Sequence, residues 1–197
     1  MDGIDTKEEI QAKANNFKEY YEENKTKEKI VGKSDELKIV KIFLASSSEL
    51  TDDRNEFEKF IGRKNKELVK ENIFLELVIW EDFCDVMSQK RLQDEYNKTI
   101  KECSIFVMLF WTKVGKYTLE EFETAYGQFK KSDRPLVYTY FKHALIDSGA
   151  LELDDLRSVK EFQTKLKELG HFQTVYKSSD DLKFKFSNQL EKVLSQI

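Results

Sequence analysis

The sequence has only two cysteines, Cys84 and Cys103, and neither belongs to a CxxC pair or a His/Cys cluster. A disulfide framework and a zinc site therefore have nothing to build on, and we expect both thiols to be small, buried side chains. No apolar run reaches the roughly 18 to 20 residues that a membrane span needs, and the first residues lack the apolar core of a signal peptide. These absences predict a cytoplasmic protein that contacts no membrane.

An excess of basic residues is also missing. Lys and Arg together number 33 against 37 Asp and Glu, which gives a formal net charge of −4. Nucleic-acid binders usually show a basic excess, so we expect no direct nucleic-acid partner. Neither GxGxxG nor the phosphate-binding P-loop motif occurs, which argues against a Rossmann dehydrogenase and a P-loop enzyme. The two histidines, His143 and His171, have no partner at triad spacing and are expected to be structural.

The chain is long enough for one substantial core. It has 197 residues, of which 40% are hydrophobic and 13% aromatic, and this leaves room for little more than one domain. Residues 1–36 are rich in Lys and Glu, with apolar positions spaced as on one amphipathic helix. They read as a charged extension and linker, either solvated or used for docking, and residues 37–197 as the domain.

Strands and helices alternate from residue 37 onward. Short apolar runs rich in β-branched and aromatic residues predict strands at 37–45, 73–80, 104–111, 135–141 and 171–176. Amphipathic spacing predicts helices at 53–69, 88–102, 118–131, 155–170 and from Ser178 or Ser179 to the end. This alternation implies right-handed crossovers, and hence an α/β fold in which helices cover both faces of a five-stranded parallel sheet.

The site is expected where the strand order reverses. In the flavodoxin-like order 2-1-3-4-5 this switch point lies between the first and third strands, and ligands bind at the carboxyl ends of those strands. The loops that leave them are ASSSELTDDR, residues 45–54, and TKVGKYTLEE, residues 112–121. Topology alone therefore brings a serine cluster opposite two adjacent glutamates, Glu120 and Glu121.

Helix geometry distinguishes the two glutamates. At about 100° per residue, Glu120 projects away from the apolar stripe into solvent, whereas Glu121 flanks the stripe at the rim of the cleft. The alternative is that both acids merely favour the helix dipole in the first turn, at roughly 0.3 to 1 kcal/mol each. The predicted buried stripe consists of Leu119, Phe122, Ala125, Tyr126 and Phe129.

Several stretches resemble bacterial domains of the Toll/interleukin-1 receptor (TIR) type, namely FLASSSEL, VIWEDF, the run from QDEYNKTIKE to YTLEEFETA, and GHFQTVYKSSDDL. The resemblance covers residues 38–197 and implies the flavodoxin-like TIR fold. In TIR domains that cleave NAD+, the catalytic glutamate lies in the third helix within an aromatic-x-x-x-Glu-(Leu/Phe) context. Glu121, four residues after Tyr117, occupies that place, so the resemblance selects the same acid as the helix geometry.

One carboxylate is chemically sufficient for cleavage of NAD+. Ordinary glycoside hydrolysis uses a second carboxyl group to protonate a poor leaving group. The nicotinamide of NAD+ is already cationic and leaves as a neutral molecule, so the remaining task is to stabilise an oxocarbenium-like ribose and hold its hydroxyls. Glu121 is predicted to do this by charge and hydrogen bonding. The expected enzyme needs no metal and no cofactor, with NAD+ as its substrate.

The other substrate contacts are assigned to the two exit loops. Ser46, Ser47 and Ser48 lead toward a helix amino terminus and are expected to bind the pyrophosphate, with ordinary helix capping as the alternative. Lys113 and Lys116 are expected to pair with phosphate, with surface exposure as the alternative. The resemblance also places SSSE at the strand exit that lines the nucleotide pocket of the family.

Aromatic side chains complete the predicted site. Trp80 and Tyr117 present flat faces at strand or loop ends, suited to stacking on adenine or nicotinamide, and core packing is the alternative for each. Arg54 is expected to be a solvated surface cation, with pairing to phosphate as the alternative. Tyr96 and Asn97 match the family pattern without a role that the residues themselves define.

The resulting hypothesis is an NAD+ glycohydrolase of TIR type, an effector of bacterial antiphage immunity that is activated by self-association. A separate or fused sensor module is an expected partner. Two alternatives stay open, a non-catalytic TIR adaptor and an enzyme similar to nucleoside deoxyribosyltransferases, in which a glutamate also acts on a ribosyl C1′. Glu121 is a helix-dipole residue in the first alternative.

Overall fold

The computed structural model describes residues 36–79, 92–146 and 152–196. The predicted extension at 1–36 therefore lies almost wholly outside the described residues. The elements follow the order β1 (Lys38–Ser46), α2 (Thr51–Leu68), β2 (Ile73–Ile79), α3 (Leu92–Glu102), β3 (Ile105–Phe110), α4 (Lys116–Ser132), β4 (Leu136–Lys142), α5 (Leu153–Glu168), β5 (Thr174–Tyr176) and α6 (Ser179–Leu194). Two short 3-10 helices, η1 (Ser48–Leu50) and η2 (Val69–Glu71), flank α2.

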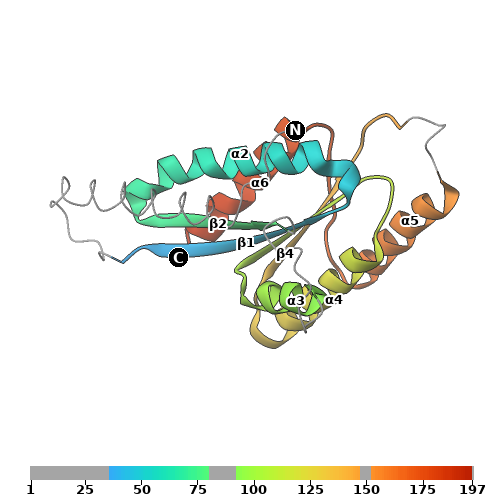
Figure 1. Ribbon diagram of the computed structural model, residues 1–197, viewed down its shortest axis with the longest axis horizontal. Coiled ribbons are helices and arrows are strands. Elements are labelled where there is room, and N and C mark those ends of the chain that lie inside the picture. The colour runs from blue at the N-terminus through green and yellow to red at the C-terminus, as the bar shows by residue number, and fades with distance from the viewer. Residues whose placement is uncertain (1–35, 80–91, 147–151, 197) are drawn as a thin grey trace.

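The five strands form one parallel sheet in the order β2-β1-β3-β4-β5. This confirms the predicted flavodoxin-like class and places the reversal of strand order between β1 and β3. Helices α2 and α6 cover one face of the sheet, and α3, α4 and α5 cover the other (Figure 1). The registers bring Ser46 of β1 beside Leu109 of β3, so the loops that leave these strands start side by side.

Each face of the sheet has its own apolar core, and the central strands supply both. Val40, Ile42 and Leu44 of β1 pack beneath α2 and α6, whereas the alternate residues Phe43 and Ala45 pack beneath α3, α4 and α5. Strand β3 is buried along its whole length. Near-continuous apolar runs of this kind are typical of parallel strands covered on both faces, which explains why the sequence pattern located them well.

At each outer edge of the sheet, a side chain binds backbone groups of one residue. On the β2 edge, the Leu75 N–H donates to Asn65 Oδ1 at 2.7 Å and Asn65 Nδ2 donates to the Leu75 carbonyl at 3.0 Å, so an amide from α2 replaces a neighbouring strand. On the other edge, Lys185 Nζ of α6 donates to the Val175 carbonyl of β5 at 2.6 Å. Unpaired backbone groups at sheet edges are thereby reduced.

We expect Asn65→Ala to lower the free energy of unfolding by about 2 to 3 kcal/mol, because it removes two buried hydrogen bonds and leaves both backbone groups of Leu75 unpaired. Chemical denaturation of the purified protein measures this. Asn188→Ala, at an exposed helical position on α6, is the matched control and should change stability by less than about 0.5 kcal/mol. Equal effects of the two substitutions would contradict a role for Asn65 at the sheet edge.

Candidate active site

The carboxyl edge of the sheet brings the two predicted loops together through Glu49. Its Oε1 accepts a hydrogen bond from the Thr112 N–H at 3.0 Å and another from Ser47 Oγ at 3.0 Å. Its Oε2 accepts from the Thr112 hydroxyl. The loop after β1 is thus joined directly to the loop after β3, as the switch-point argument required. The sequence analysis included Glu49 only as the last residue of the SSSE stretch and gave it no role of its own, since nothing local marks a carboxylate whose partners lie in another loop.

The prediction that Arg54 is a solvated surface cation is wrong. Its side chain is 3% exposed, and its guanidinium donates to Ser46 Oγ at 2.8 Å, to the Ser47 carbonyl at 3.0 Å and to Thr51 Oγ1 at 3.1 Å. A planar group with five donors can bind several acceptors of one loop at once. Arg54 therefore holds the serine loop against the start of α2.

These contacts engage two of the three predicted substrate-binding serines. The Ser46 hydroxyl accepts from Arg54, and the Ser47 hydroxyl donates to Glu49, whereas the Ser48 residue is exposed. The helix that starts at Ser48 is a 3-10 helix of three residues, followed by α2 with Leu50 as its N-cap. Pyrophosphate binding by these serines stays a prediction.

Glu121 lies on the buried face of α4, one turn and a half from the carboxyl edge of the sheet. Only 7% of the residue is exposed. Burial, and secondly the neighbouring charge of Glu120, raises the pKa of its carboxyl from 4.5 to about 7. Among the residues described here, neither a hydrogen-bond donor nor a cation offsets this burial. Carboxylates left uncompensated at the predicted ligand-binding edge are candidates for function rather than for stability.

The buried stripe of α4 differs from the predicted one at its start. Thr118 and Glu121 are buried together with Phe122 and Ala125, at the i, i+3, i+4, i+7 spacing of one helical face, whereas Leu119 is 38% exposed. The burial of Leu119 was therefore predicted wrongly. The buried face of α4 begins at Thr118, one residue before the predicted start at Leu119. The apolar pattern missed this because Thr118 and Glu121 are polar.

Glu120 was also predicted wrongly to lie in solvent. The residue is half-buried, and Asn97 Nδ2 of α3 donates to Glu120 Oε1 at 3.1 Å. Thr124 Oγ1 donates to Asn97 Oδ1 at 3.2 Å, so Asn97 bridges two residues of α4. This gives Asn97 a structural role between α3 and α4. Of the two glutamates, Glu120 is held by a partner, whereas Glu121 has no such partner within the described ranges.

The structure describes only part of the remaining predicted site. Tyr117 is 64% exposed at the start of α4, and Lys113 is half-buried in the loop before it. Trp80 and the rest of the WEDF segment, residues 81–83, lie outside the described residues, and so does the side chain of Lys116. Substrate contacts by these four residues stay predictions.

A partly buried ion pair, which the sequence analysis did not find, lies at the same edge of the sheet. Lys142 Nζ at the end of β4 contacts Asp53 Oδ2 of α2 at 2.7 Å, and the Asp53 side chain is only 4% exposed. Lys142 Nζ also lies 4.9 Å from the ring centroid of Trp111, which follows β3. The pair joins residues that are 89 positions apart in the sequence.

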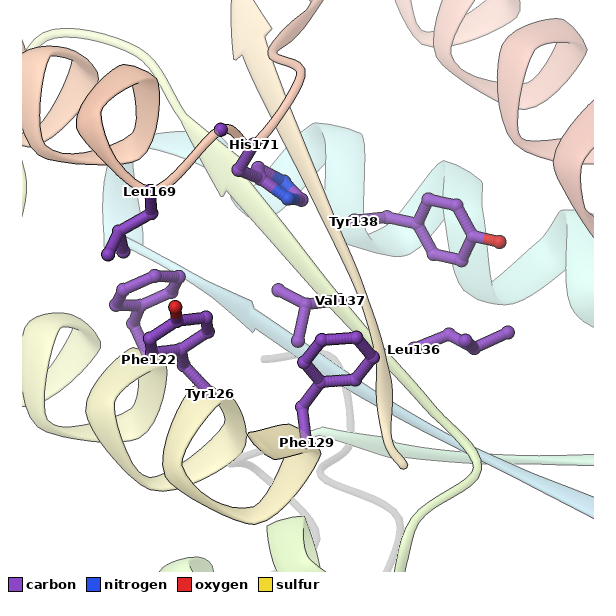
Figure 2. Close-up of a pocket in the computed structure, with 9 residues that line it drawn as sticks. Phe122, Tyr126, Phe129, Leu136, Val137, Tyr138, Leu169 and His171 are labelled. Carbon is purple, nitrogen blue, oxygen red and sulfur yellow. The ribbon is translucent and has the colours of Figure 1, made fainter. Parts of the chain in front are cut away.

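An apolar pocket of about 330 Å³ lies at the opposite edge of the sheet (Figure 2). In Figure 2 the rings of Phe122, Tyr126 and Phe129 follow one another along α4, on the side where Val137 and His171 lie. The pocket also includes Leu136, the first residue of β4, so it belongs to the amino-terminal edge of the strands. Ligands of doubly wound sheets bind at the carboxyl edge, so we do not assign the substrate to this pocket.

The side chains of His171 and Cys103 lie in surroundings that favour a structural role. The Nε2 atom of His171 lies 3.1 Å from Thr139 Oγ1, and burial lowers the pKa of this histidine. Cys103 is buried as predicted, and burial raises the pKa of its thiol to about 12. Cys84 lies outside the described residues. Within the described ranges, no group of three or more His, Cys, Asp or Glu residues is placed to hold a metal ion.

Comparisons with known proteins give little further evidence about the fold. A scan against protein-family models and a search of curated proteins found no match. Among solved structures, a Clostridium botulinum CMP N-glycosidase, BcmB, is similar with a TM-score of 0.43 and 15% identity, over 75% of this chain and 98% of that chain. The α/β class therefore rests on the strand order of the chain itself. None of the helices in the described ranges is long and apolar enough to cross a membrane.

Proposed function

We propose that this chain is a TIR-type NAD+ glycohydrolase, an enzyme that cleaves the bond between nicotinamide and ribose. The observation that carries the proposal is Glu121, a buried carboxylate with a raised pKa and no compensating cation among the described residues, next to the switch point of a flavodoxin-like sheet. The resemblance to TIR domains selects the same residue.

The surroundings of Glu121 suit the proposed chemistry. A carboxylate in a poorly solvated site interacts strongly with positive charge, and both the pyridinium ring of NAD+ and the oxocarbenium-like ribose of the transition state are cationic. Since nicotinamide leaves as a neutral molecule, the reaction needs no second carboxyl group as general acid. Glu49, which joins the two loops, has both carboxylate oxygens engaged by Ser47 and Thr112.

The test is direct incubation of the purified chain with NAD+, followed by chromatography of free nicotinamide. A panel of other N-glycosides, including free deoxynucleosides and CMP, runs in parallel, because one buried carboxylate can act on any activated ribosyl C1′. Nicotinamide release supports the proposal. Turnover of nucleosides or nucleotides without turnover of NAD+ would overturn it in favour of a deoxyribosyltransferase-like or nucleotide N-glycosidase activity. No turnover by folded, self-associated protein would favour an adaptor.

Activation by self-association is part of the proposal, as is a role as effector of antiphage immunity with a separate or fused sensor. We expect the specific activity to rise with protein concentration and with a crowding agent, because copies of the chain would complete or order one another's sites. Initial rates of nicotinamide release over a hundredfold range of protein concentration measure this. A rate strictly proportional to protein over that range would contradict activation by assembly.

A further inference from the structure

Glu49 connects the two loops of the candidate site and uses its whole carboxylate to do so. It accepts the Thr112 N–H, the Thr112 hydroxyl and the Ser47 hydroxyl, and Thr112 is 63 positions away in the sequence. Hydrogen bonds to an ionised carboxylate are stronger than those between neutral groups. With both oxygens engaged inside the protein, Glu49 is placed to fix the position of Thr112 rather than to contact a substrate.

Thr112 lies in the short loop that leads into α4. Only residues 111–115 separate the end of β3 from Lys116, the first residue of α4. Within this loop the Val114 N–H donates to Ser158 Oγ of α5 at 3.0 Å, and the Leu119 N–H donates to the Gly115 carbonyl at 3.1 Å as the helix starts. Glu121 follows within the second turn of the same rigid helix. A shift of the loop at Thr112 would therefore be passed on to the Glu121 carboxylate.

We propose that Glu49 is a positioning residue. It holds the loop after β3, and through this loop it fixes where α4 starts relative to the sheet and where Glu121 lies for the reaction. The part concerning Glu121 rests on the proposed glycohydrolase activity, whereas the part concerning the loop does not. Displacement of a catalytic group by about 1 Å can lower a rate a hundredfold, so a residue that never touches the substrate can still control turnover.

The loop is tested without any activity measurement. Hydrogen exchange followed by mass spectrometry compares wild type with Glu49→Ala. Exchange is expected to rise about tenfold or more in peptides covering residues 112–120, with no change in α2 or α6. Glu71→Ala is the matched control, because Glu71 is an exposed glutamate in the other short 3-10 helix, at the far end of α2. Unchanged exchange at residues 112–120 would overturn the proposal, whether or not the protein cleaves NAD+.

The link to Glu121 is tested by steady-state kinetics on NAD+. Glu49→Ala is expected to lower kcat about tenfold or more, with KM changed less than about threefold, because Glu49 does not contact the substrate. Glu49→Gln keeps one acceptor oxygen for the Thr112 N–H and should recover part of both kcat and exchange protection. Thr112→Val, which removes only the hydroxyl contact, should lower kcat less, and its combination with Glu49→Ala should add little further loss.

The exchange and kinetic experiments together distinguish failure of the positioning role from failure of the proposed function. Raised exchange together with lowered kcat supports the positioning role. Raised exchange with unchanged kcat, in an active wild type, would overturn it. If the wild type releases no nicotinamide at all, the proposed function fails, and the exchange result alone still decides whether Glu49 holds the loop after β3.

Discussion

Glu121→Gln is expected to abolish nicotinamide release and, at the same time, to stabilise the folded protein at neutral pH. The loss of turnover should be about a hundredfold to ten-thousandfold, because the amide has nearly the same shape but no negative charge to stabilise the oxocarbenium-like ribose. The gain in stability follows from burial of the ionised carboxylate with no compensating cation among the described residues. Few substitutions at a merely structural acid would move activity and stability in opposite directions.

The sign of the stability effect follows from proton linkage. Between pH 4.5 and about 7 the unfolded chain has released the Glu121 proton while the folded chain retains it, so stability falls as the pH rises through this window. Above it, the buried carboxylate costs the folded state about 3 kcal/mol. Glu121→Gln should therefore unfold at a higher temperature than wild type at pH 8 and at the same temperature at pH 4.

Thermal unfolding across pH 4 to 8, together with the nicotinamide assay, measures both effects. Glu123→Gln is the matched control, since Glu123 lies on the same helix with a half-exposed side chain and an ion pair to Lys165. The activity of wild type should rise with pH as Glu121 ionises, with a midpoint near 7 in kcat/KM. Activity that falls with rising pH would instead indicate a protonated Glu121 acting as a general acid. Turnover by Glu121→Gln at the wild-type rate would refute the catalytic role.

Lys142→Met is expected to lower the free energy of unfolding by about 3 kcal/mol or more, because it leaves the buried Asp53 carboxylate without its cation. The charge of Asp53 also reaches the core, where it contributes, after burial itself, to the raised pKa of the Tyr176 hydroxyl. Asp53→Asn should cost less, since the Lys142 side chain is 20% exposed and can turn its ammonium group toward water.

Chemical denaturation of wild type, both single variants and the double variant forms a complete cycle. Asp53→Asn combined with Lys142→Met should recover much of the stability lost in Lys142→Met alone, since no unpaired charge stays buried. Arg157→Met is the matched control, because the Arg157–Asp154 pair has side chains 69% and 90% exposed and should contribute less than about 0.5 kcal/mol. Additive losses in the double variant would show that the two residues do not act as a pair.

The sequence predicted the sheet well because its signal is local. Each strand is a short apolar run, and the parallel order follows from the alternation with helices, so β1 and β3 were placed beside one another correctly. Strand β5 was predicted to begin at His171 but begins at Thr174, since the strand-like sequence pattern starts three residues before the pairing with β4 does. The sequence pattern shows only which residues are apolar, whereas the bounds of a strand depend on its pairing with the neighbouring strand.

The candidate site was predicted less completely, for a physical reason. The choice of Glu121 over Glu120 used only the rotation of a helix, and the burial of Glu121 agrees with it. Arg54, Glu49 and Lys142 act through partners that the fold brings together from other loops and strands. Buried charged side chains of this kind look like ordinary surface residues in a sequence, because burial is decided by tertiary contacts.

The side chains at the two sheet edges also limit how copies of this chain can assemble. Asn65 occupies the backbone groups of Leu75 on one flank, and Lys185 occupies the Val175 carbonyl on the other. A strand from a second molecule would have to displace these side chains before it could pair with the sheet, which disfavours open-ended polymerisation of the amyloid kind. Copies of the chain can still associate through helices and loops, because such contacts leave these two side chains in place.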